Sequence, residues 1–166
     1  AALVCFALAS PALATDITAA RYTDPTTRYA HGVLGDAVEW GALEFSHSDG
    51  TITRLVLPSD RVFEDLAPRL YDVDQNGTQE AVVIESHATQ GARLAIYAAS
   101  GLMDATPYIG RRNRWLAPAA IADLDGDGRI ELAYVDRPHL AKTLRVWRFG
   151  TTGLTEIASL AGVTTQ

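Results

Sequence analysis

Short apolar runs of alternating character, separated by clusters of glycine, aspartate, serine and asparagine, fill most of the chain. In "RLAIYA" (93–98) and "LRVWRF" (144–149), apolar side chains recur at every second position, with β-branched and aromatic residues among them. A period of two over short runs predicts strands, and no long stretch of helical period lies between residues 30 and 160. The pattern therefore predicts an all-β protein.

Two segments repeat each other. "LAPRLYDVDQNGTQEAVVI" begins at Leu66 and "LAPAAIADLDGDGRIELAYV" begins at Leu116. Each joins an apolar stretch to an acidic loop and then to a second apolar stretch. The unit is about 50 residues long, which is typical of a β-propeller blade. A degenerate copy without the acidic loop precedes them, in which "VEWGALEF" and "TITRLVLP" flank an Asp49-Gly50 hairpin signal.

These units predict a β-propeller segment over residues 15–166, with a degenerate blade at about 30–65 and blades at about 66–110 and 116–161. Propellers usually close with about 4–8 blades, so three units predict a partial propeller. The chain is then a fragment of a longer protein, or it completes a ring by association. A β-sandwich built from the same hairpins is the alternative fold.

The acidic loops share one spacing of oxygen-bearing side chains. "DLDGDGRIE" places carboxylates at positions 1, 3, 5 and 9, and "DVDQNGTQE" places Asp, Asp, Asn and Glu at the same positions. Alternate side chains in a tight loop turn toward one point, and a glycine at position 6 lets the carbonyl of position 7 face the same point. Only oxygens are offered, which suits Ca²⁺ better than Mg²⁺, because Mg²⁺ requires a stricter octahedron.

The spacing excludes an EF-hand. An EF-hand ligates through a Glu at position 12, where these loops have Val83 and Tyr134. Here the last acidic residue stands at position 9 and a strand follows it. A solvated acidic turn is the alternative for a single loop, but two copies in register between predicted strands favour a metal loop.

These loops, each between short strands of a unit of about 50 residues, resemble the FG-GAP and VCBS repeats, the calcium-loop blades of integrin α-chain propellers and of many secreted bacterial proteins. The resemblance is strong for residues 66–160 and faint for 20–65. It implies a propeller with Ca²⁺ in hairpin loops on one rim. The implied ligands of the first loop are Asp72, Asp74, Asn76, the Thr78 carbonyl and Glu80. Those of the second are Asp123, Asp125, Asp127, the Arg129 carbonyl and Glu131.

Both loops carry Glu at position 9, where the family more often has Asp. Gln79 also replaces the apolar residue that Ile130 supplies before the last ligand. Because the first loop has one carboxylate fewer, we expect the second loop to bind Ca²⁺ more tightly. Affinities of about 10⁻⁴–10⁻³ M, as in extracellular modules, are expected.

The first 14 residues, "AALVCFALASPALA", are uncharged and end in a small-x-small sequence. They read as the apolar region and cleavage site of a clipped secretory signal peptide, so the mature chain would begin at Thr15 and be secreted or periplasmic. At that length they are too short for a membrane span, so we expect no membrane insertion after cleavage. The single cysteine, Cys5, lies in this segment, which leaves the mature chain without disulfides.

The formal net charge of −6 argues against nucleic acid as a partner. We expect a binding or scaffold module for a protein or carbohydrate ligand, with structural Ca²⁺. A hydrolase or lyase on a propeller rim is the alternative, although no catalytic motif is present; His31 with Asp36 is the nearest to a general-base pair. The basic cluster "GRRNRW" (110–115) suits either an anionic or sugar ligand or a solvated loop between blades.

Overall fold

The computed structural model describes residues 16–163, so the predicted signal peptide lies outside the described residues. The described chain contains twelve strands and no helix, which confirms the all-β prediction. Within these residues there is accordingly no helix long and apolar enough to cross a bilayer. The strands are β1 (Ile17–Thr26), β2 (Glu39–His47), β3 (Ile52–Val56), β4 (Arg61–Phe63), β5 (Arg69–Tyr71), β6 (Glu80–His87), β7 (Gly91–Ala98), β8 (Gly101–Ala105), β9 (Leu116–Ala122), β10 (Glu131–Asp136), β11 (Thr143–Gly150) and β12 (Gly153–Ala161).

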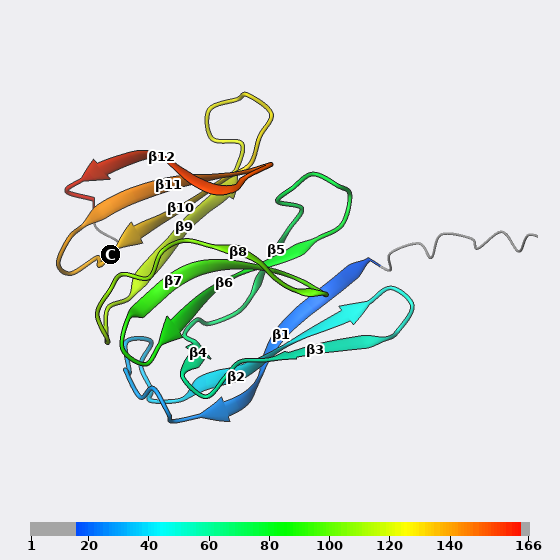
Figure 1. Ribbon diagram of the computed structural model, residues 1–166, viewed down its shortest axis with the longest axis horizontal. Coiled ribbons are helices and arrows are strands. Elements are labelled where there is room, and N and C mark those ends of the chain that lie inside the picture. Colours follow the sequence, from blue (N-terminus) through cyan, green and yellow to red (C-terminus); the bar gives the residue numbers. More distant parts are fainter. Residues whose placement is uncertain (1–15, 164–166) are drawn as a thin grey trace, which may run out of the picture.

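The strands form three antiparallel units that lie one above another (Figure 1). The first unit is β1, β2 and β3, with β2 in the middle. Strands β5 to β8 form the second unit and β9 to β12 the third, each a meander in which sequential strands pair. The short strand β4 pairs with both β2 and β6, so it joins the first two units into one sheet. The arrangement is that of propeller-like blades that do not close into a ring.

The first unit begins before the residues to which the repeat pattern assigned it. Strand β1 pairs along most of β2, from Ile17 opposite His47 to Thr26 opposite Glu39. Its sequence, "ITAARYTDPT", has few apolar residues because one face is open to solvent, and only Ile17 and Tyr22 are buried. The Asp49-Gly50 hairpin is confirmed, since β2 and β3 pair on either side of it.

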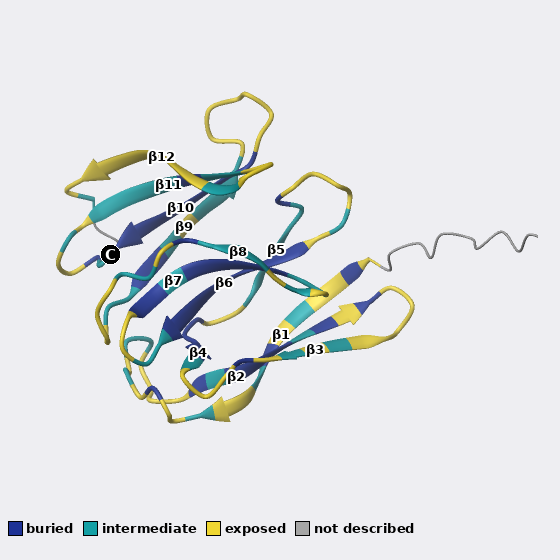
Figure 2. Ribbon diagram, in the orientation of Figure 1, coloured by how far each residue is buried: buried dark blue, intermediate teal, exposed yellow. Residues whose placement is uncertain are grey.

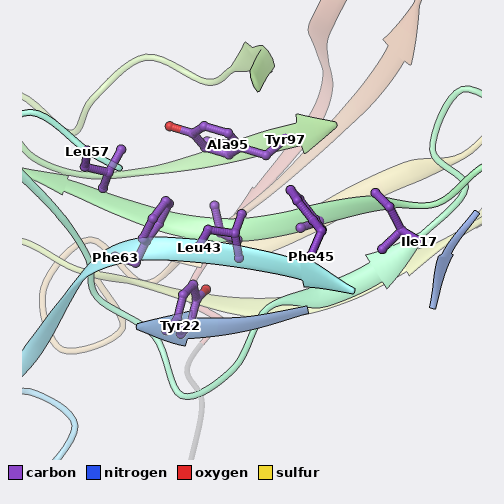
Figure 3. Close-up of a cluster of buried hydrophobic side chains, with 10 residues drawn as sticks. Ile17, Tyr22, Leu43, Phe45, Leu57, Phe63, Ala95 and Tyr97 are labelled. Carbon is purple, nitrogen blue, oxygen red and sulfur yellow. The ribbon is translucent and has the colours of Figure 1, made fainter. Parts of the chain in front are cut away.

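The two central strands of the middle unit, β6 and β7, are buried on both faces, as those of a blade between neighbours must be. Alternate side chains of β6 and β7 enter two different hydrophobic clusters. Val83 and Tyr97 face the first unit and pack in one cluster with Leu43 and Phe45 of β2 and with Phe63 of β4. Figure 3 shows Tyr97 beside these side chains. The side chains on the opposite face pack against the third unit. They are Val82, Ile84, Leu94 and Ile96, and their partners are Leu116, Leu132 and Tyr134. Figure 2 shows the contrast between buried β6 and β7 and exposed β12.

One carboxylate is fully buried inside this packing. Glu85 of β6 accepts hydrogen bonds from the hydroxyls of Tyr97 and Tyr108, both at 2.6 Å, and from Arg93 at 2.9 Å. Arg61 lies 3.3 Å from the same carboxylate. These donors lower the pKa of Glu85 against the opposing effect of burial, so the charge is retained and compensated.

Candidate metal centre

The two acidic loops emerge on the same side of the molecule (Figure 1). The first, residues 72–79, connects β5 to β6, and the second, residues 123–130, connects β9 to β10. Because the units are stacked, the loops of neighbouring blades also touch: Gln75 Nε2 donates to the carbonyl oxygen of Gly128 at 2.8 Å. The repeat therefore places both loops on one rim.

The first loop brings three carboxylates together. One oxygen each of Asp72, Asp74 and Glu80 lie within 4.8 Å of one another. Glu80 is only 2% exposed and accepts a hydrogen bond from the Val73 amide at 2.9 Å. Asp72 Oδ2 accepts from the Gly77 amide at 2.9 Å, whereas Asp72 Oδ1 is buried and has no hydrogen-bond partner among the residues that the structure describes. A buried, unpaired carboxylate oxygen is costly unless a cation faces it.

Asn76 and Thr78 shape the turn of this first loop. Asn76 Oδ1 accepts from the amide and hydroxyl of Thr78, and Asn76 Nδ2 donates to Asp74 at 3.0 Å. Side-chain oxygens that accept from the amide two residues on favour such tight turns. Gly77 adopts a φ of +91°, which glycine tolerates without strain. The Asn76 oxygen is thus engaged inside the turn.

The second loop repeats this arrangement. Asp123, Asp125 and Glu131 each offer an oxygen within 4.8 Å of the others, and fully buried Glu131 accepts from the Leu124 amide at 2.8 Å. The two oxygens of Asp123 accept from the amides of residues 126, 127 and 128. Asp127 Oδ1 accepts from the Arg129 amide at 2.9 Å, as Asn76 does from Thr78. Among residues 16–163, these two loops are the places where three such ligand groups converge.

A residue that the sequence reasoning missed lies in the second cluster. Arg148 of β11 donates from Nε to Glu131 at 2.7 Å and from Nη2 to Asp125 at 2.7 Å, and its Nη1 lies 3.1 Å from Asp127. Strand register puts it there, because Arg148 pairs directly with Glu131. Arg148 could be assigned to this cluster only from the pairing register of β10 and β11.

The electrostatics of the two loops differ accordingly. Burial, and then the neighbouring charges of Asp74 and Asp72, raise the pKa of Glu80 to about 7. In the second loop, the hydrogen bond from Arg148 lowers the pKa of the exposed Asp125 carboxyl. Within the described part of the chain, no cation pairs with the first cluster, whereas Arg148 pairs with the second.

The chemistry of both loops suits a hard cation. Each offers several carboxylate oxygens from a fixed turn, with no nitrogen or sulfur ligand, and oxygen-only sets of this kind favour Ca²⁺. The unpaired Asp72 oxygen is an acceptor that such an ion would satisfy.

Stacked blades with acidic loops on one rim define a propeller-like repeat protein. Residues 72–134 match the family model described as an FG-GAP-like repeat. The match runs from the start of the first acidic loop into β10, so it includes both loops. The chain therefore contains an FG-GAP-like repeat, as the resemblance of its loops predicted. No curated protein and no solved structure matches the chain.

The other residues singled out in the sequence, His31 and the basic cluster 110–115, lie at the ends of the strands opposite to the acidic loops. His31 Nδ1 is 2.5 Å from buried Glu64, not paired with Asp36, and the Ser86 hydroxyl donates to the other oxygen of Glu64. Part-buried His31 and buried Glu64 thus form a pair, and no serine hydroxyl within residues 16–163 is seen to hydrogen-bond to the imidazole. Of the basic cluster, Arg114 and Trp115 line a pocket of about 190 Å³ together with His31 and His139.

Proposed function

We propose that this protein is an exported calcium-binding propeller-like module in which Ca²⁺ has a structural role. The observation that carries the proposal is the convergence of three carboxylates in each acidic loop, with the third one buried at the start of a strand. An ion held there would link the loop to β6 or β10. It would also neutralise charges that otherwise repel, so binding would stabilise the folded state by linkage.

The residues that would hold the ion in the first loop are Asp72, Asp74 and Glu80, and those in the second are Asp123, Asp125 and Glu131. The carbonyl oxygens of Thr78 and Arg129, and the side chains of Asn76 and Asp127, complete the set that the family resemblance implies. Bound Ca²⁺ supplies charge neutralisation and cross-linking of the turn, and no reaction step.

Thermal unfolding tests this role. In 10 mM Ca²⁺, a dissociation constant of about 10⁻⁴–10⁻³ M gives about 1.4–2.7 kcal/mol of stabilisation for each loop that binds an ion. For a domain of this size that corresponds to a rise in melting temperature of about 3–10 °C above the value in chelator. Mg²⁺ should give a smaller rise.

The informative variant is Asp74→Asn combined with Asp125→Asn, which keeps the shape of both turns and removes one ligand charge from each. Its melting temperature should no longer respond to Ca²⁺. The matched control is Asp49→Asn, in the β2–β3 turn, where a single exposed aspartate accepts from Thr51. The control should respond as the wild type does. An equal response to Ca²⁺ in all three proteins would count against the loops as the binding site.

Export is supported by the apolar segment 1–14, which ends in a small-x-small cleavage sequence. Millimolar external Ca²⁺ would also suit loops of the expected affinity. Sequencing the N-terminus of the protein recovered outside the cytoplasm should give Thr15 as the first residue. Recovery of the uncleaved chain from the cytoplasm would contradict this part of the proposal.

A binding or scaffold role, toward a protein or carbohydrate ligand, completes the proposal. It is supported by the pocket at the opposite ends of the strands from the acidic loops, whose lining includes the aromatic side chain of Trp115 and the cation of Arg114. Arg114→Ala is the appropriate probe because, among residues 16–163, the Arg114 side chain hydrogen-bonds to the adjacent Asn113 carbonyl and to no other group. Its loss should weaken ligand binding in a glycan or protein array without lowering the melting temperature, and unchanged binding of every ligand would argue against this pocket.

A further inference from the structure

The two acidic loops have matching turns but different neighbours on the adjoining strand. In the third unit, Glu131 pairs across the hairpin with Arg148. In the second unit, Ala81 pairs with Tyr97, so the next position of the same register sets Ala98 beside Glu80. The repeat therefore has a guanidinium at this position in one blade and a methyl group in the other.

The Arg148 guanidinium contacts the carboxylates of the second loop as a bound metal ion would. Its three nitrogens reach three different carboxylates, those of Asp125, Asp127 and Glu131, at 2.7, 3.1 and 2.7 Å. The side chain is 18% exposed, so the guanidinium lies over the cluster and not in open solvent. A planar fork of donors is well suited to hold several carboxylate oxygens at once.

The first loop has no such group. Among the described residues, no ion pair involves Asp72, Asp74 or Glu80. Asp72 Oδ1 is buried without a hydrogen-bond partner, whereas its counterpart, Asp123 Oδ1, accepts from two backbone amides. Of the two loops, only the first therefore has, among the described residues, a buried carboxylate oxygen without a hydrogen-bond partner.

We propose that Arg148 is a built-in counter-ion of the second loop, which it holds folded without metal, so that the first loop is the one that depends on Ca²⁺. The part of this inference that concerns Ca²⁺ binding rests on the proposed calcium function. The second loop would bind Ca²⁺ only when the guanidinium withdraws. The expected order of affinity is therefore the reverse of the order expected from the number of carboxylates alone.

The loss of Ca²⁺ affinity in the second loop depends on the fraction of time for which Arg148 is withdrawn from the carboxylates. A site that is competent in only 1–10% of molecules binds about 10- to 100-fold more weakly than its intrinsic affinity. The second loop should accordingly need at least about tenfold more Ca²⁺ than the first, and Arg148→Met should remove that penalty. The reciprocal change, Ala98→Arg, should give the first loop a counter-ion and weaken its binding of Ca²⁺.

Hydrogen–deuterium exchange of the whole chain can read each loop separately, through peptides that cover residues 72–80 and 123–131. In chelator, the wild-type second loop should be protected and the first loop should not. Titration with CaCl₂ should protect the first loop at the lower concentration. In Arg148→Met, the second loop should lose its protection in chelator and regain it with Ca²⁺.

The matched control is Arg145→Met, on the same strand, because Arg145 pairs with Asp136 and Glu156, away from the loop. It should leave the exchange of residues 123–131 unchanged. A thermal melt of each variant in chelator shows that it is folded before its loops are compared.

Two results would overturn the inference: equal exchange of residues 123–131 in wild type and Arg148→Met in chelator, or protection of both wild-type loops at the same Ca²⁺ concentration. Failure of the calcium function looks different. In that case no loop of any variant responds to Ca²⁺, and the comparison in chelator still decides whether Arg148 holds the second loop.

Discussion

The carboxyl group of Glu39 gives the strongest expectation for the pH dependence of stability. Glu39 begins β2 and is only 2% exposed. Burial, and then the negative charges of Glu64 and Asp36, raise its pKa to about 8 from an ordinary value of 4.5. The perturbation is Glu39→Gln, which keeps the shape of the side chain and mimics its neutral form.

The sign follows from proton binding. Between pH 4.5 and about 8, the folded protein keeps the Glu39 proton while the unfolded chain has lost it. The free energy of unfolding therefore falls as pH rises through this window, by at most about 1.4 kcal/mol per pH unit. The ceiling over the whole window is about 5 kcal/mol. Because water and local relaxation compensate a newly charged carboxylate, we expect about 1–3 kcal/mol.

Urea denaturation at pH 5, 7 and 9, with Ca²⁺ held constant, measures this difference. Glu39→Gln should match the wild type near pH 5 and exceed it by about 1–3 kcal/mol at pH 9. The control removes an exposed carboxylate, Glu156 of β12, and should keep the pH dependence of the wild type. Parallel curves for Glu39→Gln and the wild type across all three pH values would refute the reasoning.

Two further changes test the interior and the connection between blades. Glu85→Gln removes the charge that compensates two guanidiniums, so it should cost about 2–4 kcal/mol in urea denaturation; a loss below about 1 kcal/mol would show that the charge is dispensable. Gly91→Ala sets a methyl group 2.2 Å from the Arg111 carbonyl oxygen at a φ of +75°, and we expect a loss of about 2–4 kcal/mol. Gly50→Ala, at a φ of +83° in open space, should cost about 1 kcal/mol, and equal losses at the two glycines would rule out the steric explanation.

The parts of the fold that the sequence could predict are those where one local pattern determines the structure. The run "AVVI" (81–84) predicts a buried strand, and it is buried on both faces because neighbouring units cover it. Strand β1 was not predicted, because it is an edge strand with only two buried apolar side chains and its pattern is mostly polar. Its place is fixed by pairing with β2, a non-local contact.

In the candidate site, too, the residues set by local sequence could be predicted and those set by strand pairing could not. Carboxylate spacing within each loop could be read directly, because nine consecutive residues determine which oxygens converge. Arg148 could not be found this way, since it stands 17 residues after Glu131 and reaches it only through the register of β10 and β11. The Glu85 cluster is similar, because Arg61 and Tyr108 come from opposite sides of it in the sequence and meet at the same carboxylate.

The position of the loops also limits what metal removal can do. Both loops lie on one rim, and the two hydrophobic clusters run between the blades; of the first loop, only Val73 enters one of them. On the other rim, the Gly91 turn packs directly on the Arg111 and Arg114 carbonyls of the connection that leads to the third unit. A chelator should therefore loosen the first loop, and through Gln75 its contact with Gly128, while the stacked blades stay folded. Ca²⁺ would then set the stiffness of one rim rather than decide whether the chain folds.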